Sequence, residues 1–161
     1  MAAVWAVDDI AFKSGPIISP RHYRKFIFPW YEEFVHIAHQ HNLKVFFHTD
    51  GVLWDLLEDL IALGIDALHP IDPICMDIDA FKGKVGKRVC LIGNTSNQVL
   101  EDGNQEEVAQ LTKERLRTLA PGGGYILGSG NSVTDDARLE DYKTMLETNR
   151  LYGGYPIRVA N

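Results

Sequence analysis

The sequence predicts an α/β protein in which five strand–helix units form part of a (β/α)₈ (TIM) barrel. Two observations support this class: short apolar segments alternate with amphipathic helical patterns along the 161 residues, and polar residues follow every apolar segment. Strict strand–helix alternation is typical of a parallel sheet with helices outside. A complete barrel needs about 250 residues. We therefore expect a single domain, residues 1–161, that supplies only part of a barrel.

The clearest unit is centred on Lys44–Gly51. Residues 45–47 form an apolar run of the kind found in strands that are buried on both faces of a parallel sheet. His48 and Asp50 follow this run, and Gly51 allows the chain to turn into the next helix. Ligands of α/β proteins bind where parallel strands end. His48 and Asp50 are therefore candidate site residues.

The elements before this unit are one strand and one long helix. Ala2–Val7 is a strand candidate that ends in Asp8 and Asp9. Ser19 can cap the helix that follows, with Pro20 in its first turn, and the helical pattern reaches His41. Pro29 should kink this helix because proline cannot donate to the preceding turn. Its aromatic residues predict packing of the helix against the sheet: Tyr23, Phe26, Trp30 and Phe34.

The remaining elements continue the alternation. Gly64 is a typical helix stop, and Asn104 with Glu107 resembles a capping box. The predicted strands are Ile65–Leu68, Arg88–Ile92 and Tyr125–Leu127, and the predicted helices are Val52–Leu63, Asp77–Lys82, Asn104–Leu119 and Leu139–Tyr152.

Polar groups at the ends of all five strands predict one shared pocket. We expect catalytic roles for His48, Asp50 and Asp9, which are the groups best suited to acid–base chemistry. Each polar group could instead bond to loop backbone and hold the turn together. The candidate substrate-binding residues are Asp8, His69, Asp72, Asn94, Ser129 and Asn131.

Charge and composition exclude several partners. The net charge of −6 leaves no basic face for nucleic acid and disfavours an acidic membrane surface. The first residues lack the basic region and long apolar core of a signal peptide. Cys75 and Cys90 have no metal-type spacing and are expected to be reduced thiols. We expect a cytoplasmic protein with a small-molecule substrate.

Five ordered motifs resemble the C-terminal half of the uroporphyrinogen decarboxylase family, whose superfamily includes the corrinoid-dependent methyltransferases. The resemblance covers nearly the whole chain and implies strands four to eight of the family barrel. Its motifs are the segments 8–20, 47–51 (FHTDG), 63–70 (LGIDALHP), 92–94 (IGN) and 121–127 (PGGGYIL).

The resemblance implies a carboxy-lyase that decarboxylates a porphyrin-type carboxylate without a cofactor. The family's aspartate and arginines that bind this substrate belong to the N-terminal part of the barrel, and Ser129 stands where the family has a histidine. We therefore expect this chain alone to be inactive, and the sequence leaves open whether it is an enzyme.

Two alternatives remain open. The methyltransferase branch binds zinc through His-x-Cys, and His48-Thr49-Asp50 keeps the histidine and the spacing but replaces the cysteine with a carboxylate. Zinc could then bind His48 and Asp50, with Asp9 or His69 as a third ligand. In the other alternative, the fragment is non-catalytic. An incomplete barrel exposes sheet edges, so a homo-oligomer or association with the missing half barrel is expected.

Overall fold

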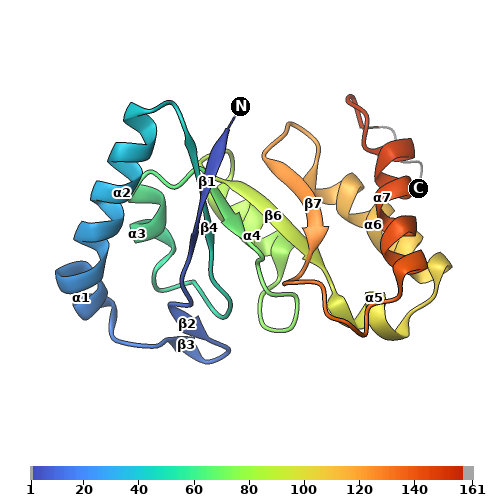
Figure 1. Cartoon of the computed structure of the whole chain (residues 1–161), viewed down its shortest axis with the longest axis horizontal. Coiled ribbons are helices and arrows are strands. Elements are labelled where there is room, and N and C mark those ends of the chain that lie inside the picture. Colours follow the sequence, from blue (N-terminus) through green and yellow to red (C-terminus); the bar gives the residue numbers. More distant parts are fainter. Residues whose placement is uncertain (1, 158–161) are drawn as a thin grey trace.

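A computed structural model describes residues 2–157 and places a five-stranded parallel sheet at the centre of the molecule (Figure 1). The strand order β1-β4-β5-β6-β7 follows the sequence, and every neighbouring pair is parallel. The predicted α/β class with a parallel sheet is thus confirmed. The strands are β1 (Ala3–Val7), β4 (Lys44–His48), β5 (Ala67–His69), β6 (Cys90–Thr95) and β7 (Tyr125–Ser129).

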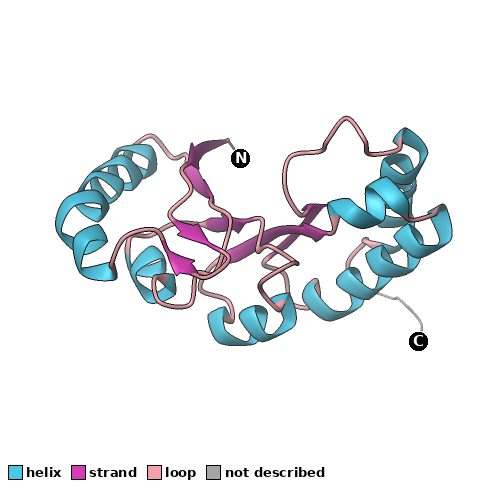
Figure 2. Ribbon diagram, turned by 90° about the horizontal axis from the view of Figure 1, so that it is seen from below, coloured by secondary structure: helices cyan, strands magenta, loops and turns pink. Residues whose placement is uncertain are grey.

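The helices alternate with the strands and lie in an arc along one side of the sheet (Figure 2). Asp77 caps α4 (Ile78–Val85) by accepting from the amides of Asp79 and Ala80, and Asn104 with Glu107 forms the predicted capping box of α6 (Gln105–Leu119). The helices that follow β4 and later strands are α3 (Leu57–Ala62), α4 (Ile78–Val85), α5 (Asn97–Asp102), α6 (Gln105–Leu119) and α7 (Leu139–Tyr152).

The long helix after β1 is interrupted before Pro29 rather than kinked at it. It consists of α1 (Pro20–His22), a π-helical segment η1 (Tyr23–Ile27) and α2 (Phe28–Gln40). Pro29 lies in the first turn of α2, where its missing N–H removes no helical hydrogen bond. The wider π-helical turn of η1 directly precedes the proline and accommodates the change of hydrogen-bond pattern there.

The predicted helix Val52–Leu63 is wrong in its first half, since α3 begins only at Leu57. The backbone amide of Val52 donates to the carbonyl of Phe12 over 2.9 Å, and that of Leu53 donates to the sulfur of Met76 over 3.2 Å. These contacts with distant segments replace the first helical turn. Phe12 belongs to a hairpin that the sequence did not predict, made of β2 (Ala11–Phe12) and β3 (Gly15–Pro16).

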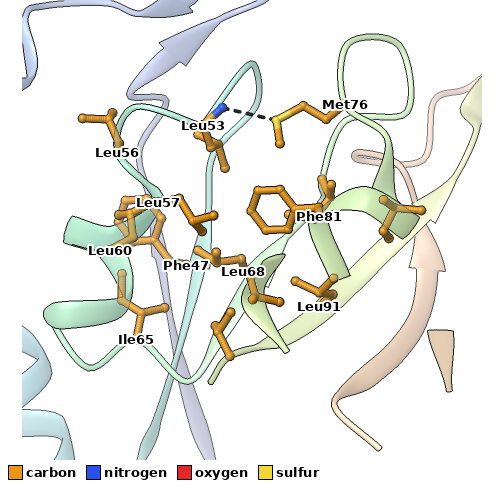
Figure 3. Close-up of a cluster of buried hydrophobic side chains, with 14 of the residues drawn as sticks. Phe47, Leu53, Leu56, Leu57, Leu60, Ile65, Leu68, Met76, Phe81 and Leu91 are labelled. Atoms are coloured by element: carbon orange, nitrogen blue, oxygen red, sulfur yellow. Dashed lines mark hydrogen bonds between the residues drawn. The ribbon is translucent and has the colours of Figure 1, made fainter. Parts of the chain in front are cut away.

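The main core lies between the sheet and the helices (Figure 3). Phe47, Leu68 and Leu91 are neighbours across three strands, and all are at most 1% exposed. Leu60 of α3 and Phe81 of α4 belong to the same cluster. This packing fixes β4, β5 and β6 side by side and therefore fixes the positions of the residues that follow them.

The opposite face of the sheet, here called the open face, carries exposed apolar side chains. Trp5 is 49%, Val7 71% and Ile126 43% exposed. Among the residues described, no helix covers this face in Figure 2. The predicted packing of the aromatic residues on the long helix is correct only for Tyr23, which is buried, because Phe26, Trp30 and Phe34 are exposed.

Two predictions about the chain's environment can be compared with the structure. Within residues 2–157, no helix combines the length and apolar character that crossing a bilayer requires. Cys75 and Cys90 are both free thiols.

We expect Leu68→Ala to lower the free energy of unfolding by about 2–5 kcal/mol, because it opens a cavity in the centre of the core. Urea unfolding followed by circular dichroism measures the change. Ile74→Ala is the matched control, since Ile74 is 73% exposed. Equal effects of the two substitutions would contradict the assignment of Leu68 to the core.

Candidate functional site

The parallel pairing of three neighbouring strands brings their last residues together. Val7 of β1 is paired with His48 of β4, and His48 is paired with His69 of β5. The residues that follow these strands therefore start from the same edge of the sheet. Asp9 and Asp50 lie just beyond β1 and β4 at this edge.

Asp9, His48 and Asp50 form a compact cluster, in which one ligand atom from each side chain lies within 4.8 Å of the other two. The backbone amide of Asp50 donates to Oδ1 of Asp9 over 3.0 Å, and Nδ2 of Asn131 donates to Oδ2 of Asp50 over 2.8 Å. Oδ1 of Asp50 is buried and has no hydrogen-bond partner in the described part of the chain. The cluster is thus held from two sides and keeps one buried oxygen unpaired.

The loop after β4 is fixed by its neighbours. Oγ1 of Thr49, which is 1% exposed, accepts a hydrogen bond from the amide of Ile10 over 3.0 Å. Gly51 has a φ of +89°, and a Cβ there would lie only 2.6 Å from the carbonyl oxygen of Phe12. The close approach of the β2–β3 hairpin therefore requires glycine at this position. Sequence reasoning identified neither role, because both depend on a segment about 40 residues earlier.

His48 and His69 form a hydrogen-bonded pair, with their Nδ1 atoms 2.7 Å apart. The rings of Trp5 and His69 are perpendicular, and their centroids are 5.4 Å apart. Burial, with the nearby charge of His48 as a second cause, lowers the pKa of His69 to about 4. His69 is therefore neutral at physiological pH.

Two of the predicted substrate-binding residues bond to other parts of the protein. The hydroxyl of Tyr31 donates to the Asp8 carboxylate, and burial followed by this contact raises the pKa of Tyr31. Oδ1 of Asp72 accepts from the amide of Ile74 over 2.8 Å, which is the local turn bond common for aspartate. Asp8 lies outside the cluster, and Asp72 lines the neighbouring pocket.

The later strands contribute amide and hydroxyl groups. Nδ2 of Asn94 donates to the carbonyl of Ile71 over 2.6 Å, while its Oδ1 is buried without a partner within residues 2–157. The hydroxyl of Ser129 donates to the carbonyl of Asn131 over 2.6 Å. Only Asn131 of these three contacts the cluster directly, through Asp50.

A pocket of about 500 Å³ adjoins the cluster and includes Asp9, Asp50 and Asn131 in its wall. Its charged side chains are four carboxylates and one ammonium group, a balance that disfavours anionic ligands. Sequence reasoning missed several wall residues in the hairpin and at the start of α5, because their proximity to β4 arises only in three dimensions. The missed polar wall residues are Lys13, Ser96, Asn97, Gln98 and Glu101.

Comparisons with known proteins place this geometry in context. The sequence model of the uroporphyrinogen decarboxylase (URO-D) family matches residues 2–152. A uroporphyrinogen decarboxylase from Tolumonas auensis is 29% identical over 138 residues, which are 83% of this chain but only 38% of the relative. The chain thus spans well under half of that relative's length.

Two solved structures share the fold. A methyltransferase from Methanosarcina mazei has a TM-score of 0.76 and 21% identity over 95% of this chain and 43% of its own. An archaeal fructose 1,6-bisphosphate aldolase has a TM-score of 0.55 and 17% identity over 95% of this chain and 59% of its own. At these identities the similarity concerns the fold.

We expect the free energy of unfolding to fall as the pH is lowered from about 6.5 to about 4. In this window His69 of the unfolded chain becomes protonated. In the folded protein His69 has a pKa of about 4 and stays neutral. The unfolded state therefore binds more protons, and stability is lost as the pH falls. Since solvent screens this partly exposed ring, the contribution should be on the order of 1 kcal/mol.

Urea unfolding at several pH values measures this effect. His69→Asn removes the titrating ring, so its stability should depend less on pH between these limits. The same slope in His69→Asn and in the unsubstituted protein would contradict the assignment.

Proposed function

Because the chain belongs to the uroporphyrinogen decarboxylase family, we propose that it forms the metal-binding part of a metal-dependent methyltransferase barrel. In this proposal its five strand–helix units correspond to strands four to eight of a (β/α)₈ barrel. Asp9, His48 and Asp50 hold a divalent cation, with zinc as the first choice. The observation that carries the proposal is the convergence of these three side chains within 4.8 Å.

The donor set fits zinc. Catalytic zinc sites use three nitrogen, oxygen or sulfur ligands from the protein and keep a further position for substrate. Bonds of about 2.0–2.2 Å place such ligands roughly 3–4 Å apart, so the cluster needs little contraction. The buried and unpaired Oδ1 of Asp50 also favours a cation, because a carboxylate oxygen without a partner is costly to bury.

Each member of the cluster makes a hydrogen bond through one of the two ligand-type atoms of its side chain. Asp9 is held through Oδ1, Asp50 through Oδ2, and His48 through Nδ1. Such contacts to the second atom of a ligand group orient it and strengthen metal binding. The chain itself therefore supplies both the ligands and the groups that position them.

Zinc in such a site would act as a Lewis acid and lower the pKa of a coordinated thiol. This chemistry suits methyl transfer to a thiol, the reaction implied by the methyltransferase resemblance. The adjoining pocket of about 500 Å³ has room for the reacting end of a small molecule. The excess of carboxylates in the pocket wall favours neutral or cationic substrate groups.

Cofactor-free decarboxylation of a porphyrin-type carboxylate is the second candidate. The 29% identical relative named uroporphyrinogen decarboxylase favours it. The pocket weakens it, because four wall carboxylates would repel a carboxylate-rich substrate and Lys13 is the one lysine or arginine among the described wall residues. This activity would require cationic groups from outside the chain.

We expect the protein to bind one equivalent of zinc in isothermal titration calorimetry. Asp50→Asn and His48→Ala should each weaken binding by more than about tenfold, because each removes a ligand. Asp55→Asn is the matched control, since Asp55 is exposed and lies outside the pocket wall. Undetectable zinc binding, or equal affinity in Asp50→Asn and Asp55→Asn, would overturn the metal proposal.

The open face supports a separate proposal about assembly. Trp5, Val7 and Ile126 expose apolar surface there, and β1 and β7 are the free edges of the sheet. Exposed apolar patches and unpaired strand edges favour association. We propose that the 161-residue chain self-associates through this face.

Light scattering coupled to size-exclusion chromatography tests self-association. The measured molar mass should exceed the monomer mass of 18.1 kDa. Ile126→Lys should lower the measured mass toward that of the monomer, because it places a charge on the open face. Ile74→Lys, which changes an exposed loop residue, should have no such effect. A monomer at high concentration refutes the proposal.

A further inference from the structure

We propose that the substrate of this site carries a protonated amino group and that Glu101 is the specificity-determining residue that binds this group. The inference rests on the proposed function, because it takes a metal at Asp9, His48 and Asp50 as its starting point. It adds the chemical class of the substrate group that lies beyond the metal.

Glu101 places a half-buried carboxylate in the pocket wall. It lies near the end of α5, and Asn97, which stands four residues earlier on the same side of the helix, also lines the pocket. The hydroxyl of Thr134 donates to Oε1 of Glu101 over 2.5 Å, which ties the carboxylate to the loop after β7. Among the described residues, no group donates to Oε2 of Glu101. One oxygen is therefore held in place and the other is left for a ligand.

A bound metal changes the wall charges that a substrate meets. A divalent cation at the cluster compensates the two carboxylates of Asp9 and Asp50. The charged wall residues that remain are Asp72, Glu101 and Lys13. Asp72 and Glu101 are half-buried, whereas Lys13 is exposed in the turn of the β2–β3 hairpin. Solvent screens an exposed charge more than a partly buried one, so the two carboxylates dominate the wall.

The order of the strands indicates how far the amino group lies from the metal. Asp50 follows β4, Asp72 follows β5, and Glu101 lies beyond β6. Neighbouring strands are about 4.8 Å apart, so roughly 10 Å separates β4 from β6. An amino group at Glu101 is therefore several bonds away from a group bound to the metal.

The apolar wall residues suit the part of the substrate between its two ends. Phe12 is 62% and Ile74 73% exposed, and both line the pocket. A ligand that covers apolar side chains gains binding energy from the area removed from water. The face of an aromatic ring also attracts cations. The wall therefore fits an alkyl chain that ends in an ammonium group.

Three six-carbon thiols that differ only in their far end test the inference on the zinc-loaded protein: 6-aminohexane-1-thiol, 6-mercaptohexan-1-ol and 6-mercaptohexanoate. Isothermal titration calorimetry at low ionic strength measures their affinities, because charge preferences are least screened there. The amine should bind most tightly and the carboxylate most weakly, with about a tenfold difference between the two.

Glu101→Gln should weaken binding of the amine by about threefold to tenfold and leave binding of the alcohol unchanged. Lys13→Gln should raise the preference for the amine over the carboxylate, because it removes the cationic wall residue. Glu114→Gln is the matched control, since Glu114 is exposed and lies outside the pocket wall. Equal affinity for the amine in Glu101→Gln and Glu114→Gln would overturn the inference, and so would tighter binding of the carboxylate.

A metal-free experiment separates this inference from the proposed function. In the double variant Asp9→Asn/Asp50→Asn, neutral amides replace the two cluster carboxylates, so the wall keeps only the charges that the metal would leave. In titrations followed by ¹H–¹⁵N spectra, hexylammonium should bind this variant more tightly than hexanoate, and adding Glu101→Gln should reduce the preference.

The two experiments fail in different ways. Absence of zinc binding in the unsubstituted protein would overturn the metal proposal, while the double variant would still decide the charge preference of the wall. Equal binding of hexylammonium and hexanoate by the double variant would overturn the role of Glu101.

Discussion

The parallel register of β1, β4 and β5 is the constraint on which the candidate site depends. It aligns Val7 with His48 and His48 with His69, so the residues after the three strands leave the sheet at one level. The buried contacts of Phe47 and Leu68 with α3 and α4 hold this register. A shift of β4 by one residue would turn His48 to the helix side and separate it from Asp9 and His69, because side chains alternate between the faces.

Orientation of the cluster comes from loop contacts that distant segments provide. Thr49 accepts a hydrogen bond from the amide of Ile10, and Gly51 lacks a side chain that would collide with the β2–β3 hairpin. Asn131, which follows β7, donates a hydrogen bond to Asp50. These contacts position the loop after β4 and the Asp50 carboxylate before any ligand arrives, which reduces the cost of binding one.

Much of the fold could be predicted from the sequence, because alternating apolar strands and amphipathic helices are local patterns. The capping box at Asn104 and the polar ends of the five strands are of this kind. The delayed start of α3 could not be predicted, since the Phe12 carbonyl and the Met76 sulfur replace its first turn. The His48–His69 bond and the wall position of Lys13 likewise depend on three-dimensional proximity. The ends of the predicted strands indicate Asp9, His48 and Asp50 as candidates, whereas their convergence depends on the register of the paired strands.

Anomalous X-ray diffraction from crystals soaked in zinc tests the central claim most directly, because it locates the metal independently of any assumed ligand. The account requires one strong peak at the C-terminal edge of the sheet, bonded to side chains of Asp9, His48 and Asp50 at about 2.0–2.2 Å. A peak elsewhere, or a structure in which these three side chains point to different parts of the surface, would contradict it.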